Sequence, residues 1–248
     1  MRTNRLGRRW GLAFVALGLF LMAPRLAGAL VTTTGCGGAT SCTLAELIAG
    51  GTITVNAMVF ADWELESIDL DGVTPDFTLI VVEGNDGGGI VRGIKFSGNG
   101  ELLVAGADRL DMALGFTVDS AVDILGNSLT ILSDTVVGTA FLTVGEFVAD
   151  GSGVGLGQKE VGTDPFFSPP IATDAIEFRV ARKKLIIEKD ILLQSSAAGD
   201  VAELDMFEQR FVPETGGTLA LVVGAGALWW LGKLRSAGAA NHHRTASI

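Results

Sequence analysis

This sequence contains few histidines and cysteines, and their positions limit the kinds of catalytic and metal chemistry that are open to it. The two histidines, His242 and His243, lie beyond a C-terminal hydrophobic run, and the chain contains no tyrosine. Residues 30–212 therefore offer no imidazole as a general base or as a zinc ligand. This excludes Ser-His-Asp and Cys-His catalysis in that part of the chain and leaves carboxylates as the abundant reactive groups.

Acidic residues dominate the same region, which contains 27 Asp and Glu against 10 Lys and Arg. Its net charge of −17 argues against a nucleic-acid partner, because binding to phosphates requires a basic surface. Two carboxyl groups are all that a glycosidase needs, so a secreted carbohydrate-active enzyme is one alternative. Among so many acids, however, a suitably spaced pair is expected by chance, and we predict no catalytic residue.

Two acidic turns bear on cation binding. One contains Asp69, Asp71 and Gly72, and the other contains Asn85 and Asp86 before three glycines. Clustered oxygen ligands suit calcium, but neither segment has a twelve-residue loop that ends in a bidentate Glu. Hydrogen bonds from Asp and Asn to their own backbone explain both turns. No cofactor or metal site is therefore predicted, and calcium is the one cation left open.

One basic cluster interrupts the acidic background, formed by Arg179, Arg182, Lys183 and Lys184. On an alternating strand such residues are typical of a solvated edge, where lysines discourage pairing with other chains. A site for an acidic polysaccharide is the alternative interpretation.

Cys36 and Cys42 are the only cysteines in the chain. They lack Cys-x-x-Cys spacing and have no histidine near them, which argues against a redox or metal pair. In an oxidising compartment such a pair forms a disulfide. The disulfide would close a small loop and contribute about 2–3 kcal/mol to stability.

Period-two alternation of apolar residues predicts an all-β protein. It is clearest over 110–118 and 176–180, and further β-rich runs are 52–60, 77–83, 90–96, 128–132, 139–148 and 184–193. Turns are predicted at Gly98-Asn99-Gly100, Gly126-Asn127 and Asp150-Gly151. Thr43 and Glu46 have capping-box spacing before Gly50-Gly51, which predicts one short helix. Together these signals predict an antiparallel β-sandwich of jelly-roll type with one N-terminal helix.

The segment 150–173 departs from this alternation. It is rich in glycine and then places Pro165, Pro169 and Pro170 around Phe166 and Phe167. We expect a long surface loop whose aromatic side chains pack against the sandwich. An exposed aromatic platform for a ligand is the alternative.

The N-terminus has the pattern of a secretory signal peptide. Residues 1–29 contain five arginines and no acid, with an uncharged apolar run over 10–23. That run is shorter than the roughly 20 residues that span a bilayer. Small residues at Ala27 and Ala29 then predict cleavage by signal peptidase after Ala29. We therefore divide the chain into a signal peptide (1–29), an extracellular domain (30–211), a sorting signal with a transmembrane helix (212–235) and a short cytoplasmic tail (236–248).

The C-terminal segment predicts a membrane anchor. A polar, turn-prone stretch precedes an uncharged hydrophobic run over 218–232, and Lys233 and Arg235 follow as a stop-transfer signal. A helix over 218–234, about 17 residues long, reaches about 25 Å, enough to cross the bilayer core. Trp229 and Trp230 lie near its end, where an interfacial belt is expected.

These C-terminal features resemble the sorting signal of PEP-CTERM proteins, which are substrates of the membrane enzyme exosortase. Val212-Pro213-Glu214 stands where that family has Val-Pro-Glu-Pro, and Thr215 replaces the second proline. The opening of the body, residues 42–47 with Gly50-Gly51, is also similar to such proteins. Two alternatives remain: Val212 to Gly216 resembles the Leu-Pro-x-Thr-Gly signal of sortase substrates, and Gly216-Gly217 resembles a GlyGly-type tail.

The resemblance implies an exported, non-catalytic surface or extracellular-matrix protein. It would be held by its C-terminal helix and then processed by an exosortase-type enzyme, at the cell surface or outside the cell. Its expected partners are signal peptidase, that sorting enzyme and an extracellular polysaccharide as the candidate ligand, with no nucleic acid.

Overall fold

The computed structural model describes residues 30–87, 92–164 and 167–214, and these form an antiparallel all-β structure with a single short helix among them. In chain order the elements are β1 (Val31–Thr34), β2 (Ser41–Thr43), α2 (Leu44–Ile48), β3 (Thr52–Val55), β4 (Met58–Asp71), β5 (Val81–Asn85), β6 (Arg92–Ser97), β7 (Leu103–Ala105), β8 (Arg109–Val137), β9 (Phe141–Asp150), β10 (Gly155–Asp164), β11 (Phe167–Ile171), β12 (Thr173–Gln194) and β13 (Val201–Pro213). The predicted all-β class is confirmed.

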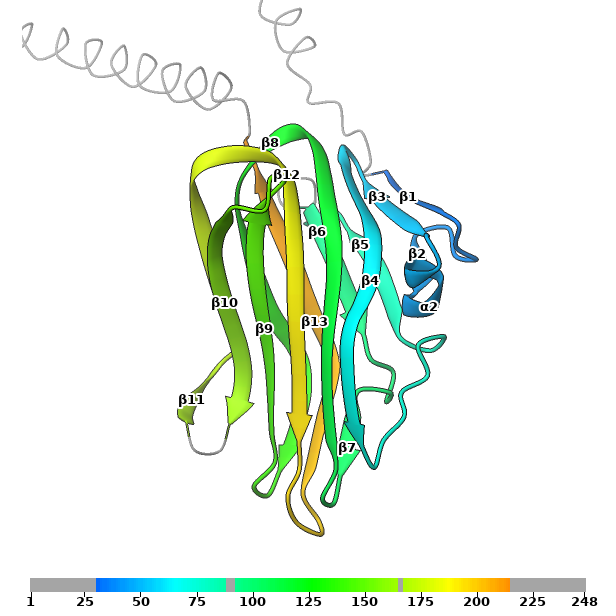
Figure 1. The fold of residues 1–248 in the computed structure, drawn as a ribbon, viewed down its shortest axis with the longest axis vertical. Coiled ribbons are helices and arrows are strands. Elements are labelled where there is room, and N and C mark those ends of the chain that lie inside the picture. Colours follow the sequence, from blue (N-terminus) through cyan, green and yellow to red (C-terminus); the bar gives the residue numbers. More distant parts are fainter. Residues whose placement is uncertain (1–29, 88–91, 165–166, 215–248) are drawn as a thin grey trace, which may run out of the picture.

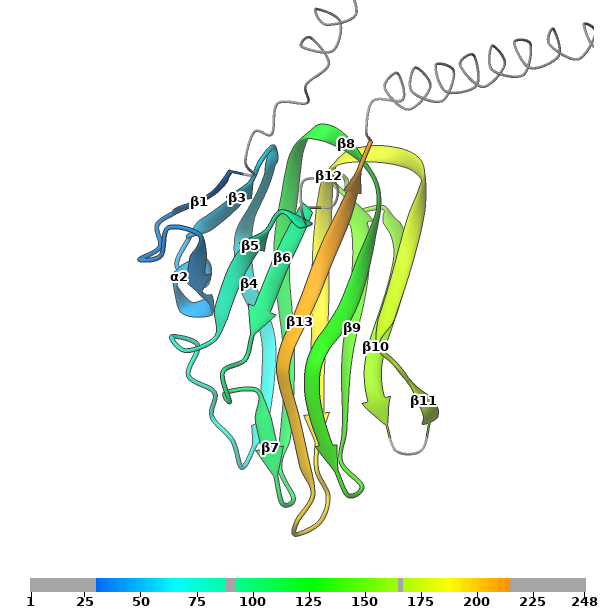
Figure 2. The same cartoon turned by 180° about the vertical axis from the view of Figure 1, so that it is seen from behind.

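The strands form two facing layers, and two long strands belong to both. Residues 109–120 of β8 pair with β4 and with residues 184–194 of β12, and β9 and β10 continue this first layer (Figure 1). Residues 124–137 of β8 pair with β13, and β6, β5 and β2 complete the second layer (Figure 2). The fold is therefore sandwich-like, as the turn-punctuated strands predicted.

A bend in the two long strands carries the chain from one layer to the other. In β12 the pairing register with β8 shifts between Glu177 and Arg182, and again between Arg182 and Lys184. Residues added to one strand in this way increase its local bend and twist. The basic cluster of Arg179, Arg182, Lys183 and Lys184 lies at this bend, rather than on a regular edge strand.

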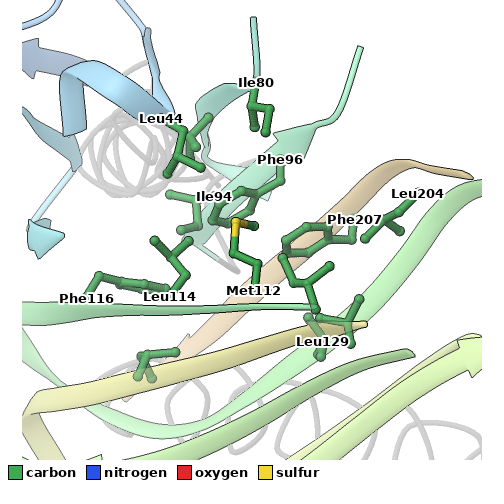
Figure 3. Close-up of a cluster of buried hydrophobic side chains, with 14 of the residues drawn as sticks. Leu44, Ile80, Ile94, Phe96, Met112, Leu114, Phe116, Leu129, Leu204 and Phe207 are labelled. Atoms are coloured by element: carbon green, nitrogen blue, oxygen red, sulfur yellow. The ribbon is translucent and has the colours of Figure 1, made fainter. Parts of the chain in front are cut away.

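The core lies between the layers and follows the alternation seen in the sequence. Leu110, Met112, Leu114, Phe116 and Val118 are each at most 2% exposed. Figure 3 shows Met112 and Leu114 of β8 directed toward side chains of the opposite layer. The aromatic rings stack in two pairs, with centroids 4.4 Å apart for Phe96–Phe207 and 4.3 Å apart for Trp63–Phe116.

The helix and the disulfide are where the sequence placed them. The side chain of Thr43 accepts a hydrogen bond from the Glu46 backbone N–H, and the Glu46 carboxylate accepts one from the Thr43 N–H at 2.8 Å. Leu44 and Leu47 of α2 are buried, which anchors the helix on the core. Cys36 and Cys42 form a disulfide with their Cα atoms 5.2 Å apart.

Two predictions about turns and loops were wrong. Gly126-Asn127 lies inside β8, where Gly126 pairs with Val212 and Asn127 pairs with Phe211. Within the segment 150–173, residues 155–164 and 167–171 form strands, since β10 pairs with β9 and β11 pairs with β10 at the end of the sheet. A proline can be accommodated in an edge strand because its missing N–H breaks no internal ladder.

The predicted signal peptide (1–29) and the predicted transmembrane run (218–232) fall outside the described residues. Within the described part of the chain, no helix is long and apolar enough to cross a membrane.

We predict that Phe116→Ala lowers the free energy of unfolding by about 3–5 kcal/mol, the usual cost of removing a buried ring. Phe116 contacts both Trp63 and Phe60, with ring centroids 4.3 and 6.4 Å away. Urea unfolding followed by tryptophan fluorescence measures the change. As a control, Val180→Ala at a side chain that is 62% exposed should stay within about 0.5 kcal/mol of the wild type. Equal effects for the two variants would contradict this description of the core.

Candidate functional site

Three strands of the first layer, β9, β10 and β12, carry functional groups on both of their faces. Because successive side chains of a strand alternate in direction, neighbours in the sequence serve different surfaces. On β12, Lys189 is buried between the layers, whereas Glu188 and Asp190 are exposed on the outer face. The outer face holds an acidic groove, and the inner face holds a buried charged cluster.

The acidic groove has a volume of about 780 Å³. One row of aligned residues crosses it on five strands, from Ser67 through Ala113, Asp190 and Gly145 to Glu160. At the normal spacing between neighbouring strands this row is about 19 Å long, which suits an extended ligand. Carboxylates dominate the lining: Glu66, Asp111, Glu160, Asp174, Glu188 and Asp190.

Small side chains leave a hollow in the middle of this face of the sheet. Ala113 and Gly145 flank Asp190 in the register and add almost no height to the sheet. At Gly115, a Cβ atom would lie 2.6 Å from a carboxylate oxygen of Glu66, so a larger residue there would push that flexible side chain aside. Phe147, which is half-buried, adds one aromatic side chain to the lining.

Two carboxyl groups in the groove have raised pKa values. Partial burial raises the pKa of Asp190, and the hydrogen-bonded neighbour Asp111 raises it further. Partial burial likewise raises the pKa of Glu66, with added repulsion from Glu188 and Glu64. Asp111 lies near enough to Asp190 for the two to share a hydrogen bond when one of them is protonated, whereas the two acids of a glycosidase lie roughly 5 Å or more apart.

The buried cluster lies between the two layers and centres on Glu146 of β9. Its Oε1 atom contacts Lys159 Nζ, and its Oε2 atom contacts Lys189 Nζ. Asn127 Nδ2 and Gln209 Nε2 also donate to Glu146 Oε1, at 2.8 and 2.9 Å. All five side chains are at most 4% exposed, so the cluster is closed to solvent.

Burial and charge pairing act in opposite directions within this cluster. Burial by itself would raise the pKa of Glu146, but Lys189 and Lys159 together outweigh it and hold the pKa below its usual value. Burial lowers the pKa of Lys159 to about 8 despite the attraction of Glu146. The pKa of Lys189 is also lowered, mainly by burial.

Sequence reasoning missed this cluster, although a signal was present. The alternating run Leu185, Ile187, Ile191 and Leu193 has Lys189 at its central core-facing position. A charged residue in the apolar phase of a strand requires a buried partner, because an isolated charge is too costly to desolvate. Phase alone, however, does not reveal which acid from another strand supplies the partner.

Two of the side chains considered as cation ligands accept hydrogen bonds from within the protein. Asp69 Oδ2 accepts a hydrogen bond from Arg109 at 3.3 Å, and Asn85 Oδ1 accepts one from the Gly87 N–H at 3.0 Å. Within residues 30–87, 92–164 and 167–214, no three His, Cys, Asp or Glu side chains are grouped to hold a metal ion.

The basic cluster at the bend is partly neutralised by acids. Arg182 Nε lies 3.4 Å from Asp150 Oδ2, and Lys184 Nζ lies 3.3 Å from Asp119 Oδ2. These pairs leave less positive charge for an acidic polysaccharide than the sequence cluster implied.

The structure reaches only the first part of the predicted sorting motif. Val212 and Pro213 are the last residues of β13 and pair with Gly126 and Ile124 of β8. The N–H of Glu214 then donates to the Asp123 carbonyl at 2.7 Å. Thr215 and the predicted stop-transfer residues, Lys233 and Arg235, lie outside the described residues.

We predict that Glu146→Ala lowers the free energy of unfolding by about 3–5 kcal/mol, because it leaves buried lysines without their counter-charge. Chemical denaturation measures the loss. The matched control is Glu83→Ala, which removes a surface ion pair of 2.8 Å to Lys95 from a side chain that is 44% exposed. That control should change stability by no more than about 1 kcal/mol. A Glu146→Ala protein as stable as the control would show that the cluster contributes nothing.

No protein-family profile and no curated protein sequence matches this chain. Among solved structures, the enzymatically active domain of bacteriophage CBA120 tailspike protein 4 matches 59% of this chain and 19% of its own, at 12% identity and a TM-score of 0.26. Arabinose-bound MgGH51 α-L-arabinofuranosidase matches 60% of this chain and 23% of its own, at 11% identity and a TM-score of 0.21. The chain thus spans less than a quarter of either structure.

Proposed function

We propose that this protein is an exported, non-catalytic surface protein that binds a cationic, amino-bearing polysaccharide in its acidic groove. The groove is the observation that carries the proposal: six carboxylates line an open trough that crosses five strands. Such a trough accepts an extended polymer at many points along its length. Its charge favours ammonium groups and disfavours uronic acids.

One pair of carboxylates in the groove lacks the spacing that a glycosidase requires. A glycosidase needs two acids separated by enough space for a sugar or a water molecule. The contact between Asp190 and Asp111 leaves no such space within that pair. Phe147 beside the carboxylates adds an apolar surface against which a sugar ring can pack.

The sorting part of the proposal rests on the sequence resemblance in residues 212–235. In this proposal a signal peptide exports the chain, the C-terminal helix holds it, and an exosortase-type enzyme processes it near Glu214. The acidic body agrees with exposure outside the cell, and the Cys36–Cys42 disulfide agrees with an oxidising compartment.

We predict that Asp190→Asn with Glu188→Gln weakens binding to quaternised chitosan at least tenfold, since two carboxylates are removed from the centre of the groove. Affinity electrophoresis or calorimetry measures binding, with alginate as the acidic polymer that should not bind. Glu203→Gln, on a strand of the opposite layer, is the matched control and should bind like the wild type. Unchanged binding in the double variant, or release of new reducing ends from the polymer, would contradict the proposal.

Binding should also weaken as the pH falls, because protonation removes the charge that attracts the ligand. The raised pKa of Asp190 means that this carboxyl takes up its proton above its ordinary value of 3.8, and Glu66 does so above 4.5. The loss should therefore begin at a higher pH than for ordinary carboxyl groups. Quaternised chitosan keeps a fixed charge, so the measured pH profile reports on the protein alone. A pH-independent affinity across this range would contradict the assignment of the groove.

Thr215→Pro distinguishes the candidate sorting enzymes. The change restores the Val-Pro-Glu-Pro motif and should increase exosortase-type processing, whereas it removes the threonine that a sortase requires. Immunoblots of membrane and released fractions measure the full-length and processed chains.

Glu214→Ala should leave export intact and cause the full-length form to accumulate in membranes. Normal processing of the Glu214→Ala chain would show that the motif is not a sorting signal.

A further inference from the structure

The buried cluster contains three groups whose contacts go beyond what a buried ion pair needs. Lys159 Nζ lies 2.5 Å from Asn127 Oδ1, so the amine sits against the side-chain amide. The same carboxylate oxygen, Glu146 Oε1, contacts both the Lys159 amine and the Asn127 amide nitrogen, the latter at 2.8 Å. An amine, an amide carbonyl and a proton acceptor are thus held together in one closed site.

Each of the three groups has a chemical use in forming an amide bond. A lysine amine is a nucleophile once it is neutral, and a hydrophobic surrounding favours the neutral form. Holding an amine and a carbonyl in contact replaces a bimolecular encounter and raises the effective concentration enormously. Exclusion of water matters as well, since water would otherwise compete for the carbonyl. Lys159 is 3% exposed and Asn127 is 1% exposed, so this condition is met.

We propose that Lys159 and Asn127 join through an autocatalytic isopeptide bond, with Glu146 as the group that transfers the proton. The Glu146 carboxylate takes a proton from the Lys159 ammonium, and the neutral Nζ attacks Cγ of Asn127. The protonated Glu146 then returns a proton to the amide nitrogen of Asn127, whose bond to Cγ breaks. The bond between Nζ and Cγ is then complete, and Glu146 is again a carboxylate. The released ammonia takes up the surplus proton of the attacking nitrogen and leaves as ammonium, so the new amide keeps one N–H. The step requires no oxidant and no other reactant.

The charge balance of the cluster favours this reaction. Two lysines and one glutamate leave an excess positive charge in a site from which water is excluded. An uncompensated buried charge is strongly unfavourable, and the reaction removes it as ammonium. The product retains a neutral amide together with the balanced pair of Glu146 and Lys189. Burial also lowers the pKa of Lys159 to about 8, which makes the neutral amine accessible near neutral pH.

The geometry selects the reacting pair from the five polar side chains. Lys189 contacts the other carboxylate oxygen, Oε2, and its Nζ lies 5.5 Å from the centroid of the Phe207 ring. Gln209 donates a hydrogen bond from its amide nitrogen to Glu146, but within the described part of the chain no donor contacts the Oε1 atom of Gln209. Lys189 and Gln209 therefore act as positioning residues that orient the Glu146 carboxylate.

The bond would join strands that no backbone ladder connects directly. Asn127 lies in the part of β8 that pairs with β13, whereas Lys159 lies on β10, which pairs with β9 and β11. The link would therefore fasten the two layers to each other through the core. It goes beyond the proposed binding function and does not depend on it.

Peptide mass spectrometry of the full chain, reduced and denatured before digestion, tests the proposal. Glu-C cleaves after Glu146 and Glu160, which places Asn127 in the fragment 102–146 and Lys159 in the fragment 147–160. These two fragments should remain joined, with a combined mass about 17 Da below their sum because ammonia is lost. Two separate, unmodified fragments from the wild-type protein would overturn the proposal.

Three variants test the roles of the residues. Lys159→Arg and Asn127→Ala remove the nucleophile and the electrophile, and Glu146→Gln removes the proton acceptor with little change in shape. Because Glu146→Gln also removes the Glu-C site after residue 146, this variant is digested with Asp-N, which places Asn127 in the fragment 123–133 and Lys159 in the fragment 150–163. All three variants should give separate fragments, whereas Lys95→Arg should give the joined pair. Loss of ammonia from Asn127 itself, through a succinimide with Ser128, leaves the fragments separate, so it cannot imitate the joined pair. Joined fragments in Lys159→Arg would overturn the assignment of the nucleophile, and joined fragments in Glu146→Gln would overturn the role of the carboxylate.

Discussion

The carboxylate of Glu146 holds together side chains from both layers of the sandwich. Lys159 and Lys189 reach it from the first layer, and Asn127 and Gln209 reach it from strands β8 and β13. Buried polar groups of this kind accept few alternative partners, because an unpaired polar group is costly in the protein interior. The cluster thus fixes how β8, β9, β10, β12 and β13 stack, in addition to the apolar contacts of the aromatic core.

The groove and the buried cluster constrain each other because they share strands. Gly145 contributes to the floor of the groove, and the next residue, Glu146, points into the core. On β12, Lys189 lies between two groove carboxylates, Glu188 and Asp190. A shift of one residue in the register of either strand would exchange the two surfaces and destroy both. Selection for the groove and selection for the core therefore act on the same backbone alignment.

Features of the fold that depend on local chemistry could be read from the sequence. The capping box at Thr43 and Glu46, the Cys36–Cys42 pair and the alternation over 110–118 all depend on neighbouring residues. The turn predicted at Gly126-Asn127 was wrong because tertiary contacts override the local preference for a turn. Asn127 donates a hydrogen bond to Glu146 and is almost completely buried. The groove and the buried partner of Lys189 could not be foreseen, since both depend on which strands become neighbours in space.

The end of β13 bears on the timing of any cut near Glu214. Val212 and Pro213 are still paired with β8, and the Glu214 N–H donates a hydrogen bond to Asp123. In the folded protein this segment is therefore held in the sheet, where a protease cannot bind it. Access then requires the last strand to fray locally, an opening whose free energy is set by the sheet rather than by the motif. The rate of cleavage at this point would therefore depend on folding. Cleavage would be fast in chains whose last strand has not yet formed and slow in fully folded chains.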